Sequence, residues 1–254
     1  MLVQGGDTAI LIDAGIGVRS LSAMLAKRGV VDGKLDAILL THEHTDHSIG
    51  AGPMARRTRA PIIANGATLS AYALRDELGF AAETLATGGE ITIGAFAIRS
   101  FPVPHDAVES VGYVLECGRM RVAYCTDAGC RTAAMGEALR GASLAVIEAN
   151  HDLEWLLRGP YTREMKARVS SPTGHLCNDD CADLIADRLD EGGPMCVWLA
   201  HLSRVNNSVS LARRAVRERI LGRTSVPFHL DVALRDQPSI TWRSGARAVQ
   251  LSLL

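Results

Sequence analysis

Four potential metal ligands crowd into one short segment of the sequence, Thr41-His42-Glu43-His44-Thr45-Asp46-His47. The apolar run Asp36–Leu40 before it is typical of a buried strand, so the histidines and the aspartate lie at the carboxyl end of that strand. A turn at this position can direct alternate side chains toward one point. The alternative is a polar loop with incidental histidines, but chance rarely produces an H-x-H-x-D-H spacing. The segment therefore predicts a metal site.

The residue types indicate which ions such a site would bind. Neutral imidazoles suit zinc and similar borderline metals, whereas a carboxylate adds charge and accepts a harder ion. Two metals roughly 3.5–4 Å apart also need a bridging group, so further ligands must come from other strand ends. Three candidates follow apolar runs: His105, Asp127 and His201. Each alone could be a half-buried histidine or a turn-capping aspartate, but their order after the motif favours ligands.

Short apolar runs alternate with helical patterns along the chain. The expected strands are Thr8–Ile12, Asp36–Thr41, Phe96–Phe101, Val111–Cys117, Val122–Thr126, Ala142–Ile147, Met195–His201 and Pro227–Leu234. The expected helices are Val18–Arg28, Ile49–Arg57, Ala67–Leu78, Asp179–Asp190 (capped by Asn178 or Asp179) and Val209–Leu221. Clustered strands separated by helices predict an α/β fold of two sheets covered by helices. Because no repeat, low-complexity tract or linker divides residues 1–254, we expect a single domain.

Composition and cysteine usage narrow the class of protein. The 254 residues are 47% hydrophobic and carry a formal net charge of −1, so charge alone indicates neither a membrane nor a nucleic-acid partner. The sequence has no run of 18 apolar residues and no opening that resembles a signal peptide. None of the six cysteines forms a C-x-x-C pair. We therefore expect small buried thiols, no disulfide framework, and a cytoplasmic enzyme that does not enter a membrane.

With these motifs the chain resembles the metallo-β-lactamase superfamily across nearly its whole length. The resemblance implies a four-layer αβ/βα sandwich that holds two divalent metal ions, most simply Zn²⁺, with Mn²⁺ as the alternative. Asp13, in Leu11-Ile12-Asp13-Ala14-Gly15, resembles the superfamily's first motif, an aspartate that braces the metal-binding loop. The implied ligands are His42, His44 and His105 for one metal, Asp46, His47 and His201 for the other, and Asp127 as the bridge.

A longer series of motifs is similar to the WalJ (YycJ) type of metallo-hydrolase, which is regarded as a DNA exonuclease linked to repair. The resemblance therefore implies a nucleic-acid substrate, with DNA favoured over RNA. The motifs are His151-Asp152, Gly159-Pro160-Tyr161, Gly174-His175-Leu176-Cys177-Asn178, Leu199-Ala200-His201-Leu202-Ser203 and Asn206-Asn207.

Two departures from the WalJ type bear on the fold. Cys177 stands where that type usually has serine. The strand and the Gly/Ser-rich turn that normally precede the segment matching Leu2–Gly15 are not in the sequence. We therefore expect a sheet without its first strand, with consequences for the sheet edge and for the rim that faces the substrate.

The Gly-His pair at positions 174 and 175 is also similar to the ribonuclease Z type. There the histidine serves at the scissile phosphate and pairs with a glutamate from a strand end; here those residues would be His175 and Glu148. The expected reaction is phosphodiester hydrolysis. Asp46 would orient the attacking water as well as bind metal, and protonated His175, held by Glu148, would protonate the leaving oxygen or stabilise the phosphorane.

Basic residues gather between His151 and His175. Arg158, Arg163, Lys166 and Arg168 could hold flanking phosphates or form an ordinary solvated face, and composition leaves the two readings about even. Aromatic residues are only 4% of the chain, which disfavours an extended base-stacking platform. His229 we interpret as structural. The candidate phosphate contacts are Arg158, Lys166, Arg168, His151 and Asn178.

Other functions compete with DNA hydrolysis. A lactonase or a glyoxalase-like thioesterase would use the same metals, but it needs neither His175 nor the basic segment. An RNA-processing nuclease would use both. A catalytically silent binding protein is disfavoured because the ligand set is complete.

Overall fold

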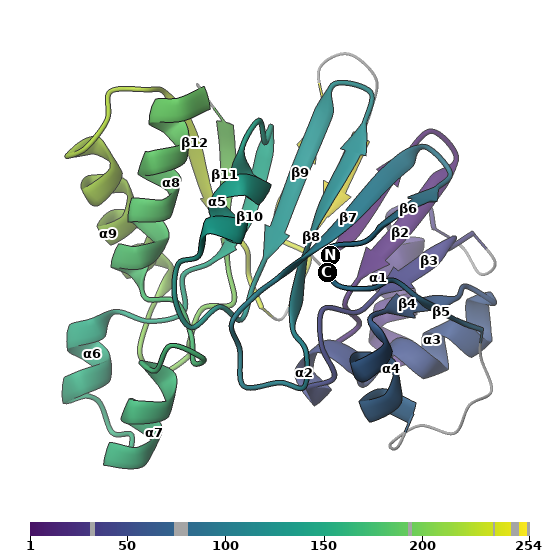
Figure 1. The fold of residues 1–254 in the computed structure, drawn as a ribbon, viewed down its shortest axis with the longest axis horizontal. Helices are drawn as coiled ribbons and strands as arrows, with labels where there is room; N and C mark the ends of the chain where they lie inside the picture. The colour runs from purple at the N-terminus through teal and green to yellow at the C-terminus, as the bar shows by residue number, and fades with distance from the viewer. Residues whose placement is uncertain (31–33, 74–80, 193–194, 236, 245–248, 253–254) are drawn as a thin grey trace.

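The apolar runs form two mixed sheets of seven strands in the computed structural model, which describes residues 1–30, 34–73, 81–192, 195–235, 237–244 and 249–252 (Figure 1). The first sheet, in the order β13-β14-β1-β2-β3-β4-β5, contains Leu2–Gly5 (β1), Thr8–Ile12 (β2), Ala37–Leu39 (β3), Ile62–Ala64 (β4), Ala82–Thr84 (β5), Thr241–Arg243 (β13) and Val249–Ser252 (β14). The second, in the order β12-β11-β10-β9-β8-β7-β6, contains Glu90–Ile93 (β6), Phe96–Pro102 (β7), Val111–Cys117 (β8), Met120–Cys125 (β9), Leu144–Glu148 (β10), Met195–Ala200 (β11) and Phe228–Val232 (β12).

Helices cover the outer face of each sheet. The first sheet packs against Val18–Ala26 (α1), Ala51–Thr58 (α3) and Gly66–Ala73 (α4), and the second against Ala133–Leu139 (α5), Asn178–Gly192 (α8) and Val209–Leu221 (α9). Three short helices lie toward one end of the sandwich, at the bottom of Figure 1: Thr45–Ser48 (α2), Leu153–Arg158 (α6) and Arg163–Val169 (α7).

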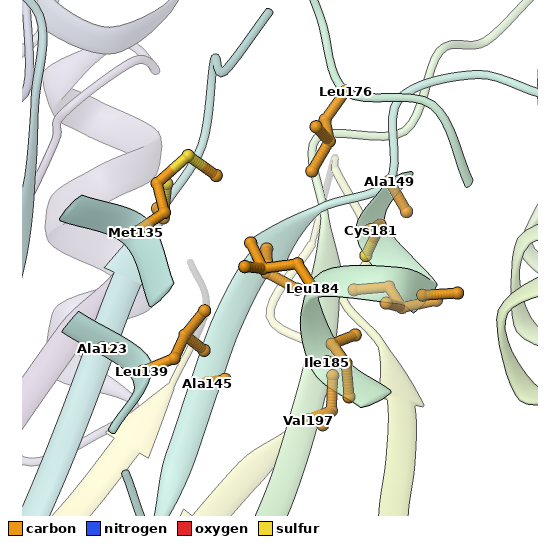
Figure 2. Close-up of a cluster of buried hydrophobic side chains, with 14 of the residues drawn as sticks. Ala123, Met135, Leu139, Ala145, Ala149, Leu176, Cys181, Leu184, Ile185 and Val197 are labelled. Atoms are coloured by element: carbon orange, nitrogen blue, oxygen red, sulfur yellow. The ribbon is translucent and has the colours of Figure 1, made fainter. Parts of the chain in front are cut away.

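Three clusters of buried apolar side chains lie between these layers. The central cluster joins the sheets through residues such as Ile12, Tyr113 and Trp198. A second cluster lies between the second sheet and its helices, where Leu184 and Ile185 of α8 pack near Val197 (Figure 2). A third fills the space under α1 and α3. This order of helix, sheet, sheet and helix confirms the expected four-layer fold, and the shared central core supports the prediction of a single domain.

The predicted elements recur with small shifts in their bounds. All eight predicted strands and five predicted helices are present, although residues 74–78 of the predicted helix Ala67–Leu78 lie outside the described residues. Short elements were missed because they offer little periodicity; all three residues of β5, for example, are exposed. The capping prediction for α8 was wrong. The Sγ atom of Cys177 lies 3.4 Å from the amide nitrogen of Asp180, in the place of an N-cap oxygen.

The first sheet continues beyond β1, on the side where the lack of a preceding strand was expected to affect the sheet edge. β1 is antiparallel to β2 on one side and to β14 on the other. Strand direction then fixes the location of the site. β2, β3, β4 and β5 are mutually parallel, as are β9, β10, β11 and β12. In an open α/β sheet, the loops that follow the carboxyl ends of such strands form the binding crevice.

Candidate metal centre

The structure brings all seven predicted metal ligands together. They leave the carboxyl ends of strands on both sheets, and their donor atoms form three overlapping groups in which every pair of atoms lies within 4.8 Å. The groups are His42 with His44 and His105, His42 with His47 and Asp127, and Asp46 with His47 and His201. The first and third groups correspond to the two metal positions implied by sequence resemblance, and Asp127 lies between them.

Asp13 fixes one side of this cluster. Its carboxylate accepts hydrogen bonds from the amide of Thr41 at 2.9 Å and from the Thr41 hydroxyl. It also lies 2.8 Å from Nδ1 of His47. Because Nδ1 is engaged, Nε2 of His47 points toward Asp127, whose Oδ2 lies 3.1 Å away. Such a partner on the second ring nitrogen orients a ligating imidazole and sets its tautomer.

His42 and His105 are oriented in the same way. Nδ1 of His42 lies 3.0 Å from the hydroxyl of Thr41, and Nδ1 of His105 lies 3.1 Å from the carbonyl oxygen of Gly174. The Nε2 atom of each ring is thereby left for a ligand. Gly174 belongs to the loop between α7 and α8, so this loop helps to position a candidate ligand.

Unsatisfied polar atoms test whether metal ions fit. Nε2 of His42, Oδ2 of Asp127 and Nε2 of His201 are buried, and none has a hydrogen-bond partner among the described atoms. Leaving such groups buried and unpaired is costly. Two cations bound among these imidazoles and carboxylates would satisfy all three, and nitrogen and oxygen donors of this kind suit zinc. The clusters are consistent with a dinuclear metal site.

The electrostatics of the cluster follow from burial and close charges. Burial would raise the pKa of Asp127, but the neighbouring His201 and His47 hold it well below its usual range. Burial lowers the pKa of His42 to about 3. For His47 burial acts in the same direction, yet Asp127 and Asp13 raise its pKa to about 9. Asp127 is therefore an anion among imidazoles, as a bridging ligand requires.

The backbone at the site is strained in a way that the sequence does not reveal. Asp13, Asp127 and His201 have φ values of 57°, 58° and 55°, in the left-handed region that non-glycine residues seldom adopt. Strain of this kind clusters at functional sites. Gly15 shows how tightly the loops pack, because a Cβ atom there would lie 1.6 Å from the carbonyl oxygen of Asp46.

Glu148 is a fully buried carboxylate that connects two histidines. Its Oε1 lies 2.9 Å from Nδ1 of His175 and 2.7 Å from Nδ1 of His201. Its Oε2 accepts hydrogen bonds from the amides of Ala128 and Leu176 at 2.8 and 3.2 Å. Burial would raise the pKa of Glu148, but His175 and the hydrogen bonds from both rings lower it to about 2. The predicted pairing with His175 is present, whereas the link to His201 was missed.

His175 lies at the edge of the ligand cluster. Its ring centroid is 5.2 Å from that of His105 and 5.3 Å from that of His201. Burial lowers its pKa, but the charge of Glu148 and the hydrogen bond to it raise that pKa above its ordinary value. Glu148 therefore stabilises the protonated form of this imidazole through Nδ1, on the opposite side of the ring from Nε2.

The basic residues of α6 and α7 differ in their distance from the site. Arg158 pairs with Glu154 at 2.6 Å, and Nζ of Lys166 donates to the carbonyl oxygen of Leu157 at 2.7 Å. Of these three residues, only Arg168 contacts a side chain that lies next to a candidate ligand. Its Nε lies 2.6 Å from Oδ2 of Asp106, whose Oδ1 lies 3.4 Å from Nε2 of His105. The position of Arg163, at the start of α7, is exposed.

Two candidate phosphate contacts are buried. His151 is 1% exposed, and burial lowers its pKa to about 4. Asn178 accepts a hydrogen bond at 2.9 Å from Nδ2 of Asn207, which also donates to the carbonyl oxygen of Ala149. Their burial argues against direct contact with phosphate. Asn178 and Asn207 instead join the loops after β10 and β11 to the start of α8, a network that sequence reasoning missed.

Remaining sequence features lie away from the cluster. His229 is exposed, and its Nε2 lies 2.8 Å from Asp231. The six cysteines, all within the described residues, are free, as expected, but only Cys125 and Cys181 are buried and the other four are half-buried. Over the described ranges, no helix is long and apolar enough to cross a membrane.

Comparisons with known proteins identify the family. A family model described as "Beta-lactamase superfamily domain" matches residues 8–189. The exodeoxyribonuclease YycJ of Bacillus anthracis is 34% identical over 221 residues, which cover 86% of this chain and 83% of that protein. The exodeoxyribonuclease WalJ of Streptococcus pneumoniae is 35% identical over 207 residues, which cover 80% and 77%.

A solved structure shares the fold at lower identity. Zn²⁺-bound PqqB from Methylobacterium extorquens has a TM-score of 0.69 and 17% identity, covering 99% of this chain and 86% of that one. This chain therefore belongs to the metallo-β-lactamase superfamily, and it is a metal-dependent hydrolase with the α/β fold of that family.

Proposed function

We propose that this protein is a dinuclear metal-dependent phosphodiesterase that acts on DNA as an exonuclease. Two similar proteins, from Bacillus anthracis and Streptococcus pneumoniae, are exodeoxyribonucleases, and the similarity to each extends over at least four fifths of this chain. The observation that carries the proposal is the His175–Glu148 pair at 2.9 Å, adjacent to the candidate ligands. Such a pair gives the site a proton donor in addition to its metals.

The candidate ligands would hold two divalent ions. One would take His42, His44 and His105, the other Asp46, His47 and His201, with Asp127 between them. When bound, these ions would supply positive charge that stabilises the phosphoryl transition state and lowers the pKa of the attacking water. We propose zinc because imidazoles predominate among the donors; Mn²⁺ is the alternative that metal titration tests.

The side chains of this chain would carry the proton transfers. Asp46 lies at the open side of the cluster, with a half-exposed side chain whose Oδ2 is 3.8 Å from Nε2 of His201. There it would orient the attacking water. His175 would release the proton from Nε2 to the leaving oxygen as the phosphorus–oxygen bond breaks, while Glu148 stabilises the imidazolium through Nδ1. The buried carboxylate keeps the ring in one orientation throughout.

The His175–Glu148 pair also separates this proposal from thioester hydrolysis. An alkoxide leaving group from a nucleotide is strongly basic and benefits from a proton donor. A thiolate leaving group is much less basic and needs little help. A glyoxalase-like thioesterase therefore gives no reason to hold a protonated imidazole beside the metals, whereas a lactonase, which also expels an alkoxide, is distinguished by its substrate.

The test is a nuclease assay with matched substrates. Protein loaded with Zn²⁺ or Mn²⁺ is incubated with end-labelled single- and double-stranded DNA and with RNA of the same sequence. We expect mononucleotides released progressively from DNA ends, and no release by an Asp127→Ala/His201→Ala variant. Preferential cleavage of RNA would replace the proposal with RNA processing. Turnover of a lactone or glutathione thioester without nucleic-acid cleavage would replace it with small-molecule hydrolysis.

The cellular setting is also a proposal. Six free thiols are consistent with a reducing compartment, so we propose a cytoplasmic location. The link to DNA repair comes from the resemblance to the WalJ type, and it stays a prediction.

A further inference from the structure

A cavity of about 290 Å³ lies beside His201, next to the candidate ligand cluster. Leu202, Val209 and Leu234 contribute apolar side chains to its wall. They come from the loop after β11, the first turn of α9 and the segment after β12, so the cavity lies at the same edge of the sheet as the ligands. Among the described residues, no side chain of α6 or α7 lines it.

Several polar groups near the apolar wall are already engaged. The hydroxyl of Ser203 accepts hydrogen bonds from the amides of Val205 and Asn206 at 3.3 and 3.1 Å. The side-chain amide of Asn207 donates to backbone carbonyls, and its oxygen accepts from the amide of Ser208. These groups are committed to the loop itself. Nε2 of His201, a candidate metal ligand, and the hydroxyl of Thr126 also line the cavity and have no hydrogen-bond partner among the described atoms. Apart from these two groups, the wall offers surface contact with little hydrogen-bond discrimination.

Two arginines give this cavity a cationic rim. Arg204 and Arg235 line it and also line a second cavity of about 300 Å³ on the side of Asp13. Nη2 of Arg235 lies 3.7 Å from Oδ2 of Asp46, so its guanidinium reaches the ligand cluster. The 13-residue helix α9 also begins here, behind its N-cap Ser208, and adds the partial positive charge of a helix N-terminus. Guanidinium groups are well suited to binding phosphate.

We propose that this cavity binds one nucleoside of the DNA strand, next to the scissile phosphodiester, and that Arg204 and Arg235 bind the adjoining phosphate. An apolar wall contacts the faces of all four bases, so binding is tolerant of sequence. The cavity volume is close to the lower end of ligand pockets, about 300 Å³, which suits one small unit. The inference rests on the proposed function and places the strand along the α9 side of the metal centre.

Binding without hydrolysis tests this inference separately. The probe is 2-aminopurine deoxyriboside 5′-monophosphate, titrated by fluorescence into the metal-loaded protein. Val209→Trp fills the cavity and should weaken binding about tenfold or more, because its side chain occupies the space of the nucleoside. Arg204→Ala should also weaken binding, and its effect should decrease as salt rises. The matched controls are Leu221→Trp, exposed at the other end of α9, and Arg214→Ala, exposed on the same helix.

Selectivity in turnover gives a second readout. The 5′ and 3′ p-nitrophenyl esters of thymidine phosphate carry one nucleoside, and bis(p-nitrophenyl) phosphate carries none. At least one nucleoside ester should have the higher kcat/KM, and Val209→Trp should abolish that preference. Melting temperature and metal content establish that each variant is folded and loaded; if Val209→Trp fails to fold, Arg204→Ala decides by both readouts.

The outcomes separate the two proposals. The first outcome is that the protein degrades DNA but that folded Val209→Trp and Arg204→Ala variants keep the affinity and selectivity of the wild type for nucleotides. This outcome overturns the cavity assignment and retains the exonuclease proposal. Nucleotide binding that Val209→Trp weakens, in a protein that cleaves no phosphodiester, overturns the exonuclease and retains the cavity as a nucleotide site.

Discussion

The ligand loops, which carry the candidate metal ligands and contain residues 42–47, 105, 127 and 201, lie at the same site as the helix pair α6–α7. The two regions differ in how they hold their polar groups. In the ligand loops the side chains of His42, His47 and Asp127 are buried, and the two rings each have a partner on the second nitrogen. In α7 no residue is buried, and in α6 only Leu156 is. Arg158 pairs with Glu154 of its own helix, Lys166 of α7 contacts Leu157 of α6, and Arg168 contacts Asp106 beside the site.

Because of this difference in burial, the position of a side chain indicates its role in the ligand loops but not in α6–α7. When one nitrogen of a buried imidazole is hydrogen-bonded to the protein, the other nitrogen is left to bind a metal, so the geometry of the ring indicates its role. An exposed guanidinium can exchange its partner at little cost, because surface ion pairs contribute only about 0–1 kcal/mol. Arg158, with its side chain 80% exposed, pairs with Glu154 but could turn to a phosphate. Experiments on the two regions should therefore give very different effects.

The largest effect should come from the ligand loops. An Asp127→Ala/His201→Ala variant should lose most of its metal and its hydrolytic activity, whereas the wild type should bind up to two divalent ions per chain. Elemental analysis and titration of metal-stripped protein measure this. His229→Ala is the matched control, because that histidine is exposed and lies outside the cluster. Unchanged uptake in the double variant would remove the basis of the dinuclear assignment.

His175→Ala should give the next largest effect. Without the proton donor, DNA turnover should fall about 10²–10⁴-fold, while metal content stays intact. The loss should be much smaller for bis(p-nitrophenyl) phosphate, because nitrophenolate is a weakly basic leaving group. Loss of metal in His175→Ala would identify this residue as a ligand instead. Equal losses on both substrates would argue against proton donation.

The sequence predicted the ligand loops well because each ligand directly follows an apolar strand. Strand ends at Cys125 and Ala200 set the places of Asp127 and His201, and parallel strands bring such ends to one edge. The left-handed backbone of both residues was beyond prediction, since it depends on packing between loops. The hydrogen bond between Glu148 and His201 could not be predicted either, because the two residues are 53 positions apart in the sequence.

The roles of the basic residues between His151 and His175 could not be predicted from the sequence. Composition could not decide between phosphate binding and a solvated face, because the partners of Lys166 and Arg168 are set by tertiary neighbours. Arg204 and Arg235 drew no attention in the sequence, since neither belongs to a charge run. Only the fold brings them to the same cavity beside the ligands.

A Lys166→Ala/Arg168→Ala variant measures the contribution of α7 to DNA binding. Each phosphate contact adds roughly −0.7 to −0.9 to the slope of log K against log[salt]. We expect the double variant to reduce that slope by about one unit rather than two, because Asp106 already neutralises Arg168. Arg119→Ala/Arg140→Ala, at two exposed positions before β9 and β10 at the opposite edge of the second sheet, is the matched control. An unaltered slope would make α6–α7 an ordinary solvated surface.

The smallest effect should come from the helices behind the loops, where Asp183 of α8 bonds Arg219 of α9 at 2.7 Å and Arg223, just after α9, at 2.9 Å. These bonds lower the pKa of Asp183 to about 2, against about 3.9 in an unfolded chain. A depressed folded pKa stabilises the protein fully above pH 4, and that contribution is lost as the pH falls toward 2.

Asp183→Asn should therefore lower the free energy of unfolding by about 1 kcal/mol near neutrality, a value limited by solvent screening. The difference from wild type should shrink below pH 4. Urea unfolding of the metal-stripped proteins across this range measures it, with Asp190→Asn, exposed on the same helix, as the control. A difference that stays constant down to the lowest pH would mean that the side chain stabilises by packing. Metal affinity at neutral pH should be unchanged, since the ligand loops take their orientation from Asp13, Thr41, Gly174 and Glu148 and not from this ion pair.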